Sequence, residues 1–182
     1  MSSERFAGIE GFSIDRVADA AGSDPEVLRL ENLDTDVPPP AAAVEATRAA
    51  VGVDDYNSYL PFTGLTELRE AVVAHLERTS GNTYHPSAET VITSSGLSGM
   101  LDALLCLVNP GDEVILTDPT YAGMINRVRL AGGTPRLVPF VVENNEWRLD
   151  LDQLRASITD RTQAMYASSS AASVQLPRME TL

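Results

Sequence analysis

Apolar residues recur at helical spacing in the first half of the chain. The clearest run follows intervals of three or four residues and comprises Leu65, Leu68, Val72 and Leu76. Gly81 stands where such a helix would end. Upstream, three consecutive prolines precede residues 41–51 and Gly52 follows them. Proline at the start and glycine at the end predict a second helix there, whereas Tyr56 to Gly64 is expected to be a loop.

Short apolar runs bounded by turn residues alternate with helical stretches in the rest of the chain. The runs predicted as strands are TVIT (90–93), EVILT (113–117), RLVPFVV (136–142) and TQAMYA (162–167). The helices predicted between them cover residues 96–108, a stretch after DPTY ending near Ala131, and residues 149–158, capped by Asp150 or Asp152. Strands alternating with helices predict an α/β fold with a doubly wound, mostly parallel sheet.

Composition narrows the possible partners. A chain of 182 residues is long enough for one compact domain. Its net charge of -13 disfavours nucleic acid and anionic membranes, because both attract clustered positive charge. The single cysteine, Cys106, rules out an intramolecular disulfide, and the first residues lack the apolar core of a signal peptide. We therefore expect a cytoplasmic protein with no nucleic-acid or membrane partner.

The segment TSSGLSGM, residues 93–100, connects a predicted strand to a predicted helix. Small and hydroxyl residues in such a turn expose backbone N–H groups at the positive end of the helix dipole, which favours a phosphate group. The same composition is also found where a helix and a strand merely pack closely. The segment lacks both the GK[ST] of a Walker loop and a full GxGxxG fingerprint.

Several motifs in a fixed order carry a family resemblance. They are YNSYLPFTGLTELREAV, VITSSGLSGMLDALL, NPGDEVILTDPTYAGMINRVRLAGG, WRLDLDQL and ITDRTQAM. Between Leu30 and Tyr166 the chain resembles the large domain of fold type I pyridoxal phosphate (PLP) dependent aminotransferases of class I and II. The resemblance implies a homodimer that transfers an amino group between an amino acid and a keto acid.

The resemblance also assigns roles to residues. It implies that the turn at Ser95, Gly96 and Leu97 binds the PLP phosphate, largely through backbone N–H groups. Tyr121 of the DPTY motif would stack on the cofactor ring, with a plain core tyrosine as the less favoured alternative. Tyr59 matches a tyrosine that reaches the phosphate in the neighbouring subunit, unless it packs locally within its loop.

The chain departs from the family after Tyr166. The expected asparagine-proline and glycine motif is replaced by ASSSAASVQLPRMETL, and the aspartate, Schiff-base lysine and small domain that follow in the family do not occur. All 13 basic residues are arginine. We therefore expect an N-terminal arm (1–30), a partial large domain (31–167) and a divergent, disordered tail (168–182), produced by a frameshift or premature stop. Such a chain would bind PLP only noncovalently and weakly, and would not catalyse alone.

Two other functions remain open at this point. One is a noncatalytic PLP or phosphate-binding module. The other is a nucleotide-binding oxidoreductase fragment, which needs an acidic ribose-binding residue about 20 residues after the glycine turn. Glu113 and Asp118 lie only loosely at that distance.

The remaining polar residues suggest little chemistry. His75 is expected on a solvated helix surface, and His85 lacks a second ligand at metal-binding spacing, so no metal site is predicted. Asp118 is expected to cap a helix. Arg127 and Arg129 are expected to be solvated or salt-bridged on the helix surface.

Overall fold

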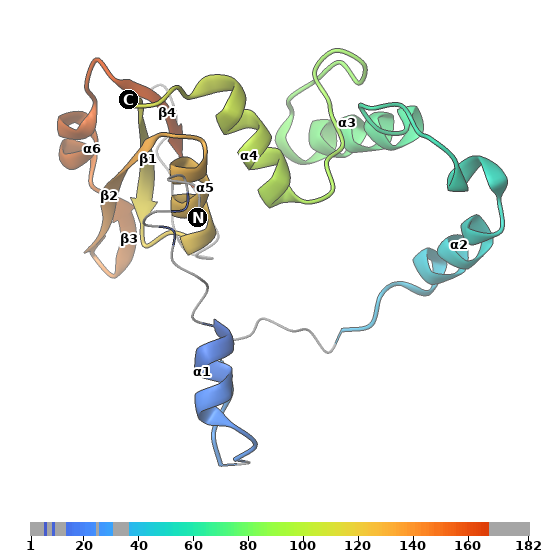
Figure 1. Cartoon of the computed structure of the whole chain (residues 1–182), viewed down its shortest axis with the longest axis horizontal. Helices are drawn as coiled ribbons and strands as arrows, with labels where there is room; N and C mark the ends of the chain where they lie inside the picture. Colours follow the sequence, from blue (N-terminus) through green and yellow to red (C-terminus); the bar gives the residue numbers. More distant parts are fainter. Residues whose placement is uncertain (1–5, 7–8, 10–13, 25, 31–36, 168–182) are drawn as a thin grey trace. The chain divides into compact units, whose positions relative to one another are not determined.

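The computed structural model describes residues 6, 9, 14–24, 26–30 and 37–167 (Figure 1). The predicted tail at 168–182 lies outside these residues. The chain divides into two compact units, one formed by Ile14–Ser94 and the other containing the described residues from Ser95 onward. We call them the helical unit and the sheet unit. Within the described residues, no helix is both long enough and apolar enough to cross a membrane.

The helical unit contains α1 (Ile14–Ala21), α2 (Ala41–Val51), the 3-10 turn η2 (Asp54–Asn57) and α3 (Thr66–Ser80). The sequence predicted α2 and α3, whereas α1 lies in the segment expected to be an N-terminal arm, for which no helix was predicted. Gly81 ends α3 in the left-handed conformation, with a φ of 75°. The predicted strand at 90–93 is wrong, since this segment is irregular. Ile92 donates its N–H to Thr63 O in the preceding loop at 3.0 Å instead of to a neighbouring strand.

Gly64 and Ile92 pack too closely for a side chain at Gly64. A Cβ on Gly64 would lie 2.6 Å from Ile92 Cβ, and the φ of Gly64 is 95°. We expect Gly64→Ala to reduce the free energy of unfolding by more than about 1 kcal/mol, because it adds a collision to an unfavourable φ. Gly81→Ala is the matched control, since its φ is also positive but no atom lies within 4 Å of the added Cβ. If chemical denaturation gave the same loss of free energy of unfolding for both variants, the close packing of Gly64 against Ile92 would be contradicted.

The sheet unit has four strands in the order β3-β2-β1-β4. They are β1 (Glu113–Asp118), β2 (Thr134–Glu143), β3 (Glu146–Leu149) and β4 (Thr162–Tyr166). The central strand β1 pairs in parallel with β2 and β4, whereas β2 and β3 form an antiparallel hairpin. The sequence analysis did not predict this hairpin, whose turn residues Asn144 and Asn145 both have positive φ. The α/β class and the mostly parallel sheet are confirmed.

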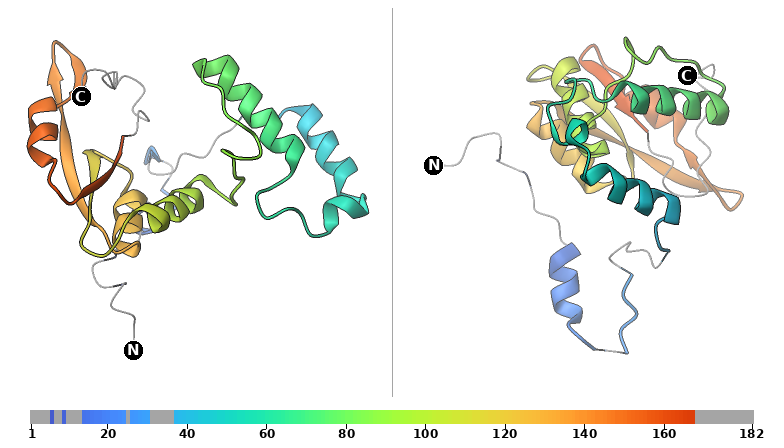
Figure 2. Two further views of the ribbon diagram at one scale, coloured as in Figure 1. Left: turned by 90° about the horizontal axis from the view of Figure 1, so that it is seen from above. Right: turned by 90° about the vertical axis from the view of Figure 1, so that its right-hand side faces the viewer.

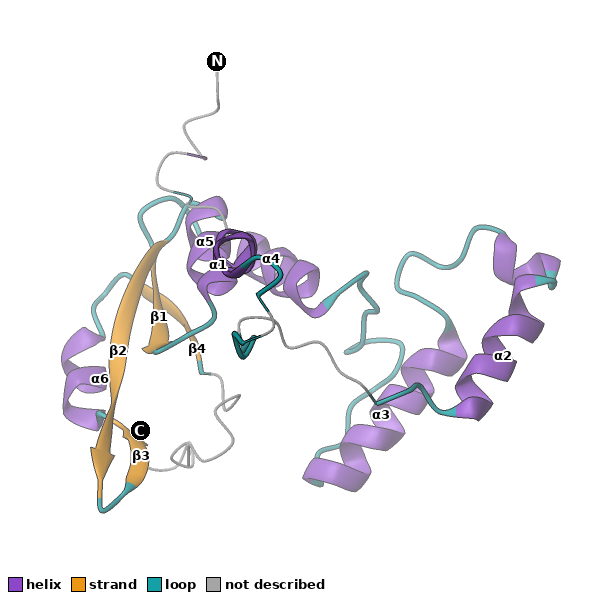
Figure 3. Cartoon of the chain, turned by 90° about the horizontal axis from the view of Figure 1, so that it is seen from below, coloured by secondary structure: helices purple, strands orange, loops and turns teal. Residues whose placement is uncertain are grey.

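Helices cover both faces of this sheet: α4 (Gly96–Leu107) and α5 (Ala122–Leu130) on one, and α6 (Leu151–Ser157) on the other (Figures 2 and 3). Alternate residues of β1 supply the two layers of core. Val114 and Leu116 pack with Leu104 and Val128 on the α4 and α5 side. Ile115 packs against the other cluster, Val138, Phe140, Leu149 and Leu154. Of the two candidate caps for α6, Asp150 accepts the N–H of Gln153 at 2.8 Å.

Candidate functional site

The first turn of α4 is capped by the side chain of Ser95. Ser95 is its N-cap, with extended backbone, and its hydroxyl accepts the N–H of Ser98 at 3.1 Å. The first amides of a helix have no intrahelical acceptor, and they lie at the positive end of the helix dipole. Since Ser95 engages Ser98, the amides of Gly96 and Leu97 are the ones left to bind a ligand.

The space around this turn is open. Ser95 and Gly96 are exposed, and a Cβ added to Gly96 would meet no atom within 4 Å. Close helix–strand packing therefore does not explain the glycine at position 96, because no atom of the described residues would meet an added Cβ there.

Tyr121 lies at the start of the next helix, directly after β1. It is the N-cap residue of α5 and remains 47% exposed, so it is not a core tyrosine. Its ring lies against Gly123, where an added Cβ would overlap it. A partly exposed aromatic ring held in this way can stack on a planar ligand.

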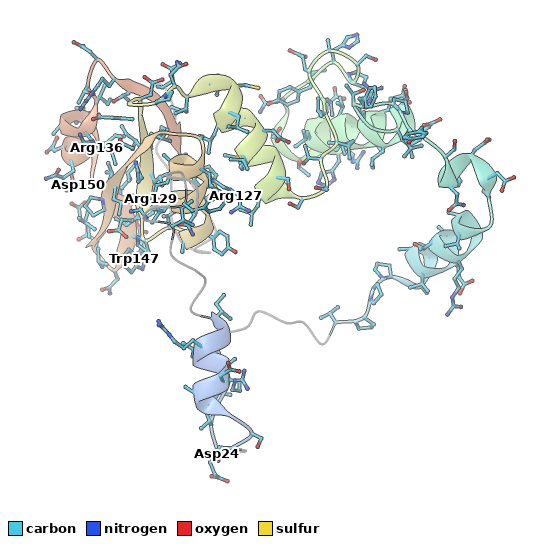
Figure 4. The ribbon with its side chains drawn as sticks, in the orientation of Figure 1. Asp24, Arg127, Arg129, Arg136, Trp147 and Asp150 are labelled. Carbon is cyan, nitrogen blue, oxygen red and sulfur yellow. The ribbon has the colours of Figure 1, made fainter. Side chains whose placement is uncertain are left out.

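Arg127 connects these two features within the sheet unit. Its Nε donates to Leu97 O at 2.8 Å, and its Nη1 donates to Gly123 O at 2.9 Å. The expectation that Arg127 is solvated or salt-bridged is therefore wrong. No local sequence signal could have revealed the contact with Leu97, because Leu97 and Arg127 lie in different helices, 30 residues apart. Arg129 lies on the same helix (Figure 4) and is exposed.

Two buried hydroxyls lie at the carboxyl end of β1. Thr117 and Thr120 flank the cis peptide bond between Asp118 and Pro119, and neither Oγ1 has a hydrogen-bond partner among the described residues. Buried polar atoms without hydrogen-bond partners are uncommon in folded proteins. Asp118 is the last residue of β1 and does not cap α5, because Tyr121 occupies the N-cap position, so that prediction is wrong.

The other candidate residues belong to the helical unit. Tyr59 belongs to the helical unit, where its side chain is fully exposed at 101%. His85 Nδ1 accepts the N–H groups of Ser87 and Ala88, both at 3.2 Å, and so stabilises a turn. Within the described part of the chain, no group of His, Cys, Asp and Glu side chains could hold a metal ion.

Glu113 is not available to bind a ribose. It lies at the amino end of β1, only 1% exposed, and accepts hydrogen bonds from Arg136, Arg161 and Thr159. The hydrogen bond from Arg136, followed by that from Thr159, lowers the pKa of Glu113 to about 2. This removes one of the two residues on which the oxidoreductase alternative depended.

The sheet unit is therefore an α/β domain with a site suited to an aromatic phosphate ester. The α4 amides can bind the phosphate, and Tyr121 can contact a ring. PLP carries a phosphate ester and an aromatic ring, so these residues fit those two parts of the cofactor. PLP, when bound, acts as an electron sink for carbanion chemistry.

Comparison with known proteins identifies the family. The model for aminotransferase class I and II matches residues 26–170. A probable N-succinyldiaminopimelate aminotransferase of Mycobacterium tuberculosis is 35% identical over 136 residues, which cover 75% of this chain and 34% of the relative. A probable aspartate/prephenate aminotransferase of Thermus aquaticus is 34% identical over 144 residues, covering 79% of this chain and 37% of the relative. The chain belongs to the class I and II aminotransferase family.

Solved structures show the same fold. An alanine aminotransferase of Pyrococcus furiosus has a TM-score of 0.79 at 26% identity, over 94% of this chain and 47% of that one. For the Thermus thermophilus aspartate aminotransferase the TM-score is 0.80 at 28% identity, over 91% and 44% of the two chains. The chain thus spans about a third of the length of the two curated relatives. The fold is that of PLP-dependent transferases, and PLP is the cofactor of the family.

Proposed function

We propose that these 182 residues provide part of a PLP site, bind the cofactor noncovalently and weakly, and do not catalyse transamination unaided. The observation that supports this is the first turn of α4, whose amides at Gly96 and Leu97 are left free by the Ser95 cap. Tyr121 would stack on the ring. The sequence contains no lysine, so no side-chain amine is present to hold PLP as a Schiff base.

The family relationship supports further parts of this proposal. The reaction of the family transfers an amino group between an amino acid and a keto acid, and we propose that class of substrate. The exposed Tyr59 would reach the phosphate bound by a second copy in a homodimer. Residues 31–167 would form the partial large domain and residues 1–30 its arm. A cytoplasmic location fits the acidic composition and single cysteine.

A noncatalytic PLP or phosphate-binding module is the second candidate, because the phosphate of PLP and inorganic phosphate would both meet the same α4 amides. A comparison of the affinities for PLP and for inorganic phosphate distinguishes a PLP site from a simple phosphate-binding module. A ring-directed PLP site requires that PLP bind more tightly than phosphate and that Tyr121→Ala reduce only PLP binding. A simple phosphate module would bind both ligands alike.

Gly96→Leu tests the position of the phosphate. The side chain would fill the space beside the amides, and we expect the affinity for PLP, measured by equilibrium dialysis, to fall about tenfold. Thermal stability should not fall, because the added Cβ would meet no atom of the described residues within 4 Å and Gly96 is exposed. Gly52→Leu is the control, since the space around Gly52 is also open but it lies at the end of α2. Unchanged PLP affinity in Gly96→Leu would place the phosphate elsewhere.

A further inference from the structure

Arg127 makes two hydrogen bonds that join the two halves of the proposed site. Its Nε reaches Leu97 O in the first turn of α4, and its Nη1 reaches Gly123 O in the first turn of α5. A guanidinium is a rigid fork of N–H donors, so two bonds to carbonyls in different helices fix their separation. The same side chain therefore holds the turn of the phosphate amides relative to the helix that begins at Tyr121.

Gly123 allows this arrangement. A Cβ at Gly123 would overlap the Tyr121 ring and would lie 3.2 Å from Arg127 Nη1. The ring and the guanidinium therefore approach the same side of one glycine. Any side chain there would displace one of them, which explains why α5 carries a buried glycine in its first turn.

The charge of Arg127 is not neutralised by a carboxylate. Among the residues that the structure describes, its hydrogen bonds go to main-chain carbonyls and it takes part in no ion pair. It is also partly buried, so solvent screens its charge less than that of an exposed arginine. An arginine remains protonated at any physiological pH. A permanent positive charge therefore lies within one hydrogen bond of Leu97.

We propose that Arg127 is a positioning residue for the phosphate ester: it fixes the first turn of α4 relative to Tyr121 and adds positive charge beside the amides of Gly96 and Leu97. This inference rests on the proposed function for its ligand. The restraint that Arg127 places on α4 does not involve a ligand. The effect on the ligand and the restraint on α4 can therefore be measured separately.

The ligand measurement compares pyridoxine 5′-phosphate with pyridoxine by equilibrium dialysis. Neither probe carries an aldehyde, so reaction with the terminal amine cannot contribute. We expect Arg127→Met to reduce the affinity for the phosphorylated probe about tenfold and to change that for pyridoxine about twofold at most. Arg127→Lys should restore part of the phosphate preference, because it keeps a charge. Arg129→Met, at an exposed position of α5, should leave both affinities unchanged.

The protein measurement is hydrogen exchange without ligand. In Arg127→Met, and to a lesser extent in Arg127→Lys, the amides of residues 98–102 in α4 should exchange several-fold faster than in the wild type. Those of β1 should keep their rates, which also shows that the variant is folded. Arg129→Met again serves as the control.

The outcomes separate the inference from the proposed function. If the wild type binds neither probe, the proposed function fails, and faster exchange in α4 of Arg127→Met still supports the restraint. Unchanged exchange in α4 overturns the inference whatever the probes do. An equal loss of affinity for both probes also overturns it, because a general loss of structure does not select for the phosphate.

Discussion

Borohydride reduction of the protein in the presence of PLP is expected to leave no stoichiometric pyridoxyl label on any side chain, and transamination is expected to stay at the level of free PLP. The physical reason is the absence of lysine: all 13 basic residues are arginine. A guanidinium stays protonated and does not form the Schiff base that a lysine amine forms. Peptide mass mapping should find label only on the terminal amine of Met1, in proportion to the PLP concentration.

A matched variant shows that the assay detects an amine. Arg129→Lys places one lysine at an exposed position of α5. We expect this variant to be labelled slowly and substoichiometrically, as the terminal amine of Met1 is, because an amine alone does not make a cofactor site. Two results would contradict the prediction: a stoichiometric adduct elsewhere in the wild-type chain, or turnover that Tyr121→Ala abolishes.

The elements that the sequence predicted well are those with a strong period and clear ends. The prolines before α2 and the glycine after it marked that helix to the residue, from Ala41 to Val51. The strand β1 was evident because every residue from Glu113 to Thr117 is buried between two layers of helix, which demands a continuous run of strand-forming residues. At these positions the local sequence pattern and the tertiary environment favour the same secondary structure.

The failures occurred where pairing partners decide the structure. The run at 90–93 has strand-forming residues, but its one described backbone hydrogen bond to a distant segment goes to the loop at Thr63. Conversely, β3 has only four residues and was obscured by the helix signal that follows it. It forms because Asn144 and Asn145 adopt positive φ and return Val142 opposite Trp147.

The candidate site likewise contains one feature that follows from local sequence and one that depends on tertiary packing. The α4 turn could be proposed from composition, because the features that suggest it are the small residues Ser95 and Gly96 and the helix that follows them. The role of Arg127 depends on Leu97, which is 30 residues away, and on the packing of α4 against α5. In sequence Arg127 and Arg129 are equivalent helix-surface arginines. Only the fold distinguishes the part-buried residue that bonds to α4 from the exposed one.

Glu113→Gln is expected to cause the largest loss of stability of any substitution considered for the sheet unit. Glu113 Oε1 accepts from Arg136 at 2.6 Å and from Arg161 at 2.7 Å, and Oε2 accepts from Thr159 at 2.8 Å. These bonds join β1 to β2 and to the turn before β4. A glutamine at this position would keep the shape but remove the negative charge from two arginines, and its NH₂ group cannot accept hydrogen bonds.

The pH dependence identifies the cause of that loss. The pKa of Glu113 is lowered from 4.5 to about 2 in the folded protein, chiefly by its hydrogen bonds from Arg136 and Thr159. Because the folded pKa lies below the unfolded one, the carboxylate stabilises the fold above the unfolded pKa, and this contribution disappears as the pH falls through about 2. Denaturant titrations at a series of pH values should therefore show a smaller loss of stability on acidification in Glu113→Gln than in the wild type.

Glu146→Gln is the control for this prediction. Its carboxylate pairs with Arg148 at 2.8 Å, but both side chains are about half exposed, so solvent weakens the pair. We expect its denaturation midpoint at neutral pH to stay near that of the wild type, whereas that of Glu113→Gln should fall clearly. Equal midpoints for the two variants would mean that the sheet does not depend on the buried carboxylate. A fall in Glu113→Gln with an unchanged acid profile would assign the loss to packing, because removal of a titrating group must alter the dependence on pH.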